Sequence, residues 1–167
     1  MTDIVPEPTL NELNPTFTVG DFDYESKLAE DLYINRTDLN EEFVRHPERF
    51  AFYATCYELA AAKAENYKTN LNRLYAVLDH EKRSELALAG VKTTEKMVEN
   101  SVITDDRYVA LQDAYLEAQK NAALLKAAMV AMQHRKDMLI QLGSAARAEI
   151  QADIRIKEAH AKSGAPT

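Results

Sequence analysis

The fold is decided by residues 57–78, YELAAAKAENYKTNLNRLYAVL, together with residues 108–139, YVALQDAYLEAQKNAALLKAAMVAMQHRKDML. In both stretches apolar side chains return at alternating intervals of three and four residues. With this average period of about 3.5 residues, a helix presents one continuous stripe to a partner helix. We call the stripes the first seam (Tyr57, Ala60, Ala64, Tyr67, Leu71, Leu74, Leu78) and the second seam (Tyr108, Leu111, Tyr115, Ala118, Ala122, Leu125, Met129, Met132, Lys136, Leu139).

Local signals around the seams predict where the long helices begin and end. Pro47 suits the first turn of a helix, so the first long helix is expected to begin there. Thr104, followed by two aspartates, is a favourable helix start and places the second long helix at 105–142. Gly90 and Gly143 are the expected stops, because glycine readily adopts the left-handed conformation that ends helices.

Two seams of comparable length predict an all-α protein built on an antiparallel long-helix hairpin that resembles a coiled coil. The connector, about residues 80–104, is expected to contain a short helix near 94–99. Residues 47–143 form the expected hairpin core. An acidic N-terminal arm with short helices, 1–46, precedes it, and a C-terminal helix with a loose tail, 144–167, follows it.

The N-terminal arm carries the acidity of the chain. The net charge is −7, and residues 1–50 hold 12 acidic and 4 basic side chains, whereas residues 51–167 hold 15 acidic and 16 basic ones. The first 20 residues have no apolar period and are expected to be extended or disordered. Two short helices should follow, over about 22–33 and from Asp38, which has the spacing of a capping box with Glu41.

Composition agrees with helix and gives no sign of export. Alanine, leucine, glutamate and lysine, which favour helix, dominate the middle of the chain. The single cysteine, Cys56, cannot form an internal disulfide and is expected to be a small buried hydrophobe. The first residues do not read as a signal peptide, and no run approaches the ~20 apolar residues of a membrane helix. A cytoplasmic location is expected.

Residues 122–132, AALLKAAMVAM, are apolar around the whole helix circumference except at Lys126. A helix that is apolar on all sides must be covered on all sides, and one partner helix covers a single stripe. Copies of the same chain are the simplest source of the missing cover, so a homo-oligomer is expected. The alternative is that residues 22–46 and 145–160 fold back over these faces. The candidate oligomerisation residues are Leu124, Leu125, Met129 and Met132.

The residue types that carry catalysis or hold metals are scattered along the chain. The four histidines are His46, His80, His134 and His160, and none has the spacing of a metal site. Four glycines far apart cannot form a phosphate-binding loop. Glu42 and His46, four residues apart, are expected to be a surface pair. We therefore expect a protein that is not an enzyme, without catalytic residues, metal or cofactor.

Seven basic residues are candidates for contacts with single-stranded DNA. They are Lys63, Lys68, Arg73, Lys82, Arg83, Lys92 and Lys96. Cations neutralise phosphates, while nearby rings such as that of Tyr67 stack on bases. The alternative is a solvated face of mixed charge, since Glu81 and Glu85 lie among these cations. A further basic cluster, His134-Arg135-Lys136, is expected at the opposite end of the hairpin.

The second half of the chain also shows a family resemblance. Its features are a lead rich in lysine and threonine (92–96), Thr104-Asp105 before Tyr108, a long helix with Ala118, Leu124, Leu125 and Lys126, the basic end His134-Arg135-Lys136, and a preceding tyrosine-rich helix from about 50 to 78. In these features, over about 90 residues, the chain resembles the UvsY-like phage recombination mediators. The acidic arm departs from that family; it could weaken DNA binding or dock a partner.

The resemblance implies a non-enzymatic protein that forms rings, binds single-stranded DNA and acts in DNA recombination and repair. Such a protein helps to exchange the strand's single-strand-binding protein for a RecA-like recombinase of phage or host, in the cytoplasm of the host cell. DNA binding in that family is carried by a basic stretch in the first half of the domain. The candidates here are Lys63, Lys68, Arg73, Lys82 and Arg83.

Two other functions fit the same sequence. A structural or scaffolding coiled-coil protein of a virion needs only the seams and self-association. A protein–protein adaptor would use the acidic arm and ignore nucleic acid. Binding to single-stranded DNA separates the first function from these two.

Overall fold

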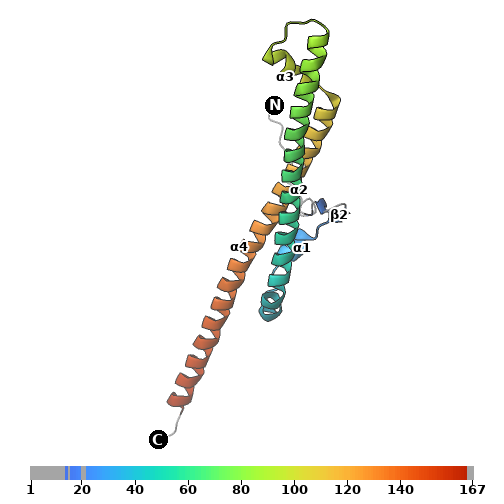
Figure 1. Ribbon diagram of the computed structural model, residues 1–167. Coiled ribbons are helices and arrows are strands. Elements are labelled where there is room, and N and C mark those ends of the chain that lie inside the picture. The colour runs from blue at the N-terminus through green and yellow to red at the C-terminus, as the bar shows by residue number, and fades with distance from the viewer. Residues whose placement is uncertain (1–13, 15, 20–21, 165–167) are drawn as a thin grey trace, which may run out of the picture. The chain divides into compact units, whose positions relative to one another are not determined.

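The computed structural model describes residues 14, 16–19 and 22–164, and the side chains of residues 14, 16, 17, 26–161 and 164. Two long antiparallel helices dominate it, as the seams predict, with shorter elements beside them (Figure 1). In chain order the elements are β1 (Thr16–Val19), β2 (Phe22–Glu25), α1 (Leu28–Leu32), α2 (Leu39–Leu88), α3 (Glu95–Ile103) and α4 (Asp106–Ser163).

The chain divides into two compact units, which are described separately. The α1 unit contains Asn14, α1, the start of α2 as far as Tyr53, and α4 from Ala128 onward. The α3 unit contains the β1–β2 hairpin, α2 from Ala54, all of α3, and α4 as far as Ala127.

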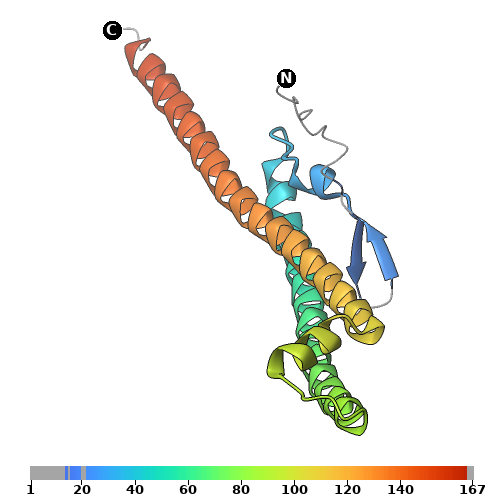
Figure 2. The same cartoon turned by 90° about the horizontal axis from the view of Figure 1, so that it is seen from above.

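The first seam forms the core of the α3 unit. Ala60, Ala64, Leu71 and Leu78 are buried along α2, which confirms the predicted stripe. At the end of the hairpin, Leu78 packs with Val98 and Val102 of α3, and Leu74, Tyr75, Leu86 and Tyr108 lie around this cluster. The short helix expected in the connector is therefore present, at Glu95–Ile103, and it covers the end of the seam (Figure 2).

Gly90 ends α2 as predicted. It has φ +66°, and its N–H donates to the carbonyl of Ala87, while the N–H of Val91 donates to the carbonyl of Leu86. This pair of bonds closes a helix by satisfying carbonyls that have no partner in the last turn.

The predicted helix start at Pro47 is wrong, because α2 runs through it from Leu39. The predicted cap at Asp38 is present: its carboxylate accepts the backbone N–H of Glu41 at 3.2 Å. A proline inside a helix removes one backbone hydrogen bond and costs about 3 kcal/mol. Buried side chains on both sides of it, Glu42, His46 and Tyr53, fix the neighbouring turns and offset that cost.

The predicted role of Thr104 is also wrong. Thr104 caps the C-terminal end of α3, and its hydroxyl donates to the carbonyl of Asn100 at 2.7 Å. The next residue, Asp105, caps α4 instead by accepting the backbone N–H of Arg107 at 3.0 Å. The start of α4 at Asp106 nevertheless lies within one residue of the predicted one.

Gly143 does not end a helix, because α4 continues to Ser163. No separate helix begins at residue 144. A Cβ added at Gly143 would lie 2.9 Å from Cζ of Phe43 in α2. Glycine at this position therefore leaves room for the Phe43 ring against α4, and it does not act as a stop.

The region before Leu28 differs from the prediction. Residues 16–19 and 22–25 form an antiparallel pair in which Phe17 lies opposite Tyr24, so the expected helix over 22–33 shrinks to α1, Leu28–Leu32. Alternating threonine, valine and aromatic residues on both sides of Gly20-Asp21 are typical of a β-hairpin. The part of the expected extended or disordered arm before residue 14 lies outside the described residues.

The second seam shifts by one residue in its later half. The buried residues of α4 from Leu125 onward are Leu125, Ala128, Met132, Arg135, Leu139 and Gly143. The predicted seam residues Met129 and Lys136 are half-buried and exposed, respectively. An arginine thus occupies the core position that had been assigned to Lys136.

Candidate nucleic-acid interface

A polar stripe on α2 combines cations, amides and an aromatic ring. Lys63, Asn66, Asn70 and Arg73 follow each other at intervals of three and four residues, so they share one face of the helix beside the first seam. Tyr67 lies between them and is half-buried. The stripe rises about 15 Å along the helix axis, at 1.5 Å per residue. We call these five residues the α2 stripe.

The α2 stripe borders two shallow grooves of the α3 unit. One groove, of about 270 Å³, is lined by Lys63, Asn66, Tyr67 and Asn70. The other, of about 200 Å³, lies where Lys63 and Tyr67 meet α4, and its further lining residues are Ala114, Glu117, Ala118 and Asn121. Small side chains on α4 leave this space open beside the tyrosine ring.

The outer cations of this region are accessible. Arg73 is exposed and forms no ion pair with any described residue. Lys68 is exposed and lies 3.6 Å from Glu65, one helical turn away. Such a surface pair is weak and can exchange its partner for a phosphate. Glu117, on the α4 side of the groove, is the one acidic residue among the described residues that line either groove.

Lys82 and Arg83 are engaged within the chain. Lys82 lies 3.3 Å from Asp105 and 3.4 Å from Glu85. Arg83 donates to Asp79 at 2.7 Å and to Glu95 at 2.6 Å. These bonds join the end of α2 to the first turn of α3 and to the cap of α4. Lys82 and Arg83 therefore stabilise this end of the hairpin, and both already have carboxylate partners.

The same contacts shift the pKa values of the groups at this end of the hairpin. Hydrogen bonds from Arg83 to Glu95 and then to Asp79 raise the pKa of Arg83 above its usual range, and they lower the pKa of both carboxyl groups. Arg107 holds the pKa of Asp105 well below its usual value, with a further contribution from Lys82. All of these groups remain charged at neutral pH.

Lys92 and Lys96 form a third group among the candidates. Lys92 lies in the turn between α2 and α3, Lys96 lies in the first turn of α3, and both are exposed. Neither forms an ion pair with a described residue. The structure therefore distinguishes three groups of cations: those in and next to the α2 stripe, those that bind carboxylates at the end of α2, and the accessible ones around the start of α3.

The four candidate oligomerisation residues differ in burial. Leu125 and Met132 are fully buried within the single chain, and Met129 is half-buried. Leu124 is 38% exposed. Large apolar side chains are exposed elsewhere on the long helices; those over half exposed in the α3 unit are Leu59, Val77, Leu88 and Leu116.

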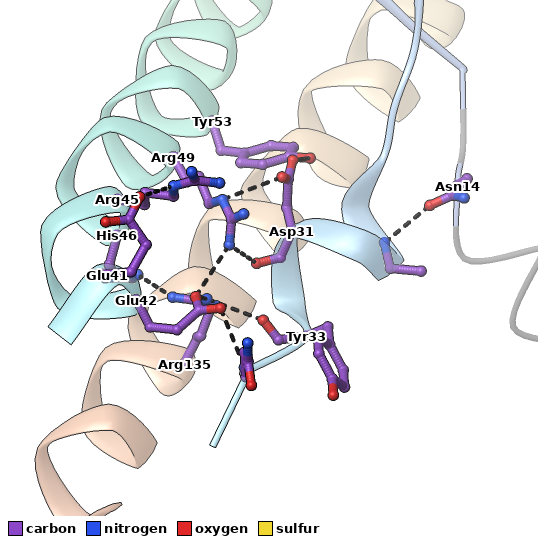
Figure 3. Close-up of polar contacts among 12 residues, drawn as sticks. Asn14, Asp31, Tyr33, Glu41, Glu42, Arg45, His46, Arg49, Tyr53 and Arg135 are labelled. Carbon is purple, nitrogen blue, oxygen red and sulfur yellow. Dashed lines mark hydrogen bonds and ion pairs between the residues drawn. The ribbon is translucent and has the colours of Figure 1, made fainter. Parts of the chain in front are cut away.

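A buried ionic network in the α1 unit was missed from the sequence (Figure 3). Arg135, whose side chain is 1% exposed, donates to Glu42 and to the carbonyl of Tyr33, and its Nη1 lies 3.3 Å from Nδ1 of His46. The prediction that Glu42 and His46 are a surface pair is wrong, since both are buried. The cluster His134-Arg135-Lys136 is likewise not one basic patch, because its middle residue points into the core.

Neither a metal site nor a membrane-spanning helix is found in the described part of the chain. Within the described residues, no three His, Cys, Asp or Glu side chains are grouped so that they could hold a metal ion. No helix in that part of the chain has the length and apolarity needed to cross a membrane.

Searches of protein-family models, curated proteins and solved structures found no match to this chain.

Proposed function

We propose that this protein is a non-enzymatic, single-stranded-DNA-binding recombination mediator that works as a ring-like homo-oligomer. The observation that carries the proposal is the α2 stripe, in which Lys63 and Arg73 flank two amides and the ring of Tyr67. A backbone-following cation at each end with an aromatic ring between them is the chemistry of sequence-independent single-strand binding.

Exposed apolar residues support self-association. Leu59 and Leu116 are each more than half exposed, on α2 and α4 of the α3 unit. Where such side chains join into one patch, they mark interaction sites in soluble proteins. A stripe that binds DNA weakly gains affinity when it is repeated around an oligomer, because the second contact is intramolecular. The modest charge of one subunit is therefore compatible with useful DNA affinity.

The partners follow from the UvsY-like resemblance and from the proposed activity. A mediator contacts a RecA-like recombinase and the single-strand-binding protein that it displaces. Both contacts can be tested by co-sedimentation with single-stranded DNA once DNA binding is established.

The direct test is a titration of a fluorescently labelled single-stranded oligonucleotide at low salt. Binding should weaken steeply with salt, because phosphate neutralisation releases counterions. The double variant Lys63→Glu with Arg73→Glu should bind much more weakly. The variant Lys157→Glu with Arg155→Glu makes the same change in charge at two exposed residues of α4 and is the matched control. No binding of the wild-type protein at micromolar concentration would end the proposal.

A second candidate function is structural: a scaffolding coiled-coil protein. It is favoured by the last part of α4, where Ile150, Ile154 and Ile156 are at least half exposed. Such a long uncovered helix suits assembly with other helices. Co-purification with capsid or tail proteins, together with absent DNA affinity, would favour this function over the first.

A further inference from the structure

His46 is the buried histidine of the described residues; His80, His134 and His160 are exposed. Its Nδ1 lies 3.3 Å from Nη1 of Arg135. A guanidinium group carries only donors, so Nδ1 of His46 must offer a lone pair at this contact. The imidazole is therefore neutral, with its proton on Nε2.

The same arginine holds a short segment of chain against the long helices. We call residues 27–38, which include α1, the strap. Arg135 donates to the carbonyl of Tyr33 in the strap at 3.0 Å and also to Glu42. Glu42 in turn accepts the backbone N–H of Asn35 at 3.2 Å. Arg135 thus links α4, α2 and the strap through one planar group (Figure 3).

Arg49 and Tyr53 hold the earlier part of the strap. Arg49 donates to the carbonyl of Asp31 at 3.3 Å, and its Nε lies 3.4 Å from the Asp31 carboxylate. The hydroxyl of Tyr53 donates to the same carboxylate at 3.0 Å. The strap is attached mainly by polar bonds, and the described part of α1 has no buried residue.

We propose that His46 is a proton-sensitive latch, whose protonation releases the strap from α2 and α4. A proton on Nδ1 would place two donors and two positive charges 3.3 Å apart in a buried site. Nε of Arg135 is already buried without a hydrogen-bond partner. The guanidinium therefore depends on its remaining contacts, and its displacement breaks the bonds to Glu42 and Tyr33 together. This inference does not depend on DNA binding.

Among the groups near Arg135, His46 is the one expected to change its charge between about pH 5 and 7.5. The charges that act on it are those of Arg135 and Lys136 from α4 and of Arg49 from α2. Glu42 and the carbonyl of Tyr33 accept from Arg135, and Asp31 is paired with Arg49. Carboxyl, ammonium and guanidinium groups ordinarily titrate outside about pH 5 to 7.5. Within that range, a change in strap attachment reports on the histidine.

The direction of the effect follows from the pKa of His46. Burial lowers this pKa below its ordinary value of about 6.5, and the charges of Arg135, Lys136 and Arg49 lower it further. The open form therefore binds the proton more readily than the closed form. Strap attachment is complete above about pH 6.5 and is lost as pH falls below it. Each unit of difference between the two pKa values changes the opening constant by up to about tenfold.

Amide hydrogen exchange of the full-length protein tests the latch. The amides of Asp31, Tyr33 and Asn35 are bonded to Lys27, Glu30 and Glu42, respectively, and report on the strap. After correction for the intrinsic effect of pH, their opening should increase several-fold, up to about tenfold, between pH 7.5 and 5.5 in the wild-type protein. His46→Gln, which keeps an acceptor for Arg135 but cannot take up a proton, should show a flat profile. His134→Gln, at an exposed histidine, should behave as wild type.

Equal pH dependence in His46→Gln and wild type would overturn the latch, as would a flat wild-type profile. If His46→Gln fails to fold, the wild-type protein still decides the matter by an NMR titration of its histidine rings. His46 must then titrate below the three exposed histidines, and a value at or above theirs overturns the proposal.

Discussion

Gly143 of α4 lies against the aromatic ring of Phe43 of α2, so closely that a Cβ at position 143 would be 2.9 Å from Cζ and 3.0 Å from Cε2. This contact explains why a glycine is tolerated inside a helix of 58 residues. Alanine would favour the helix by about 1 kcal/mol relative to glycine, but here it would collide with the ring.

We therefore predict opposite effects of Gly143→Ala in two backgrounds. In the wild-type protein the partly exposed Phe43 ring must move aside for the methyl group, so the variant should be destabilised by up to about 1 kcal/mol, the low end of the cost of overpacking. In a Phe43→Ala background the ring is absent, and the same substitution should stabilise by up to about 1 kcal/mol. Urea denaturation of the four proteins measures both values. The same sign in both backgrounds would contradict the contact.

The buried Arg135 gives a second prediction, with its neighbour as the control. Arg135→Met removes one partner of a buried ion pair and leaves Glu42 with less compensation, so it should destabilise by about 3–5 kcal/mol. Lys136→Met changes the same charge on an exposed side chain and should stay within about 0.5 kcal/mol. Chemical denaturation measures the loss of unfolding free energy in each variant. Comparable losses would contradict the buried position of Arg135 and favour the predicted seam through Lys136.

Arg135 and Lys136 also show how much of the fold can be predicted from the sequence. The 3.5-residue spacing predicted both long helices, and before Leu125 it predicted residues of α4 that are half-buried. Beyond Leu125 two stripes have the same alternating spacing of three and four residues. One passes through Ala128 and Arg135, and the other passes through Met129 and Lys136. The choice depends on Glu42, which lies 93 residues before Arg135 in the chain, and no local pattern contains that information.

Local propensity was overridden where tertiary contacts were strong. Pro47 and Gly143 are both good signals for a helix boundary, yet each lies inside a helix beside buried partners. In the candidate site, sequence reasoning identified the basic residues but could not distinguish Arg73, which is accessible, from Arg83, which binds Asp79 and Glu95. That distinction requires the position of α3 against the end of α2.

The ion pairs at the end of the hairpin predict a response to acid. The pKa values of Asp79, Glu95 and Asp105 are lowered in the folded protein, so their contribution is present above about pH 4 and is lost as pH falls below it. Hydrogen exchange of the Val98 amide in α3 should accelerate, after intrinsic correction, between pH 4.5 and 3. Arg83→Gln should open this region already at neutral pH and weaken its acid dependence. An unchanged acid profile in that variant would contradict the stabilising role of Arg83.

Leu124 and Leu125 separate assembly from folding. Leu125 is fully buried within the chain, so Leu125→Ala should cost about 2–5 kcal/mol of subunit stability. Leu124 is partly exposed, so Leu124→Glu should leave stability nearly unchanged while it lowers the mass measured by light scattering. If Leu124→Glu leaves the mass of the wild-type assembly unaltered, this face of α4 is not a subunit interface. A wild-type mass of 18.8 kDa at every concentration would exclude the oligomer itself.

Arg73 provides the sharpest prediction for DNA binding, because it is exposed and has no ion-pair partner among the described residues. A side chain that neutralises one phosphate contributes about 0.7 to the slope of log affinity against log salt on single-stranded DNA. Arg73→Gln should therefore reduce the slope by about that amount per subunit engaged, and weaken binding equally for oligonucleotides of different sequence. Arg83→Gln tests the alternative within the same titration. Since Arg83 is already bonded to Asp79 and Glu95, its loss should leave the slope nearly unchanged. If Arg83→Gln reduces the slope more than Arg73→Gln does, DNA binds at the end of the hairpin and not at the α2 stripe.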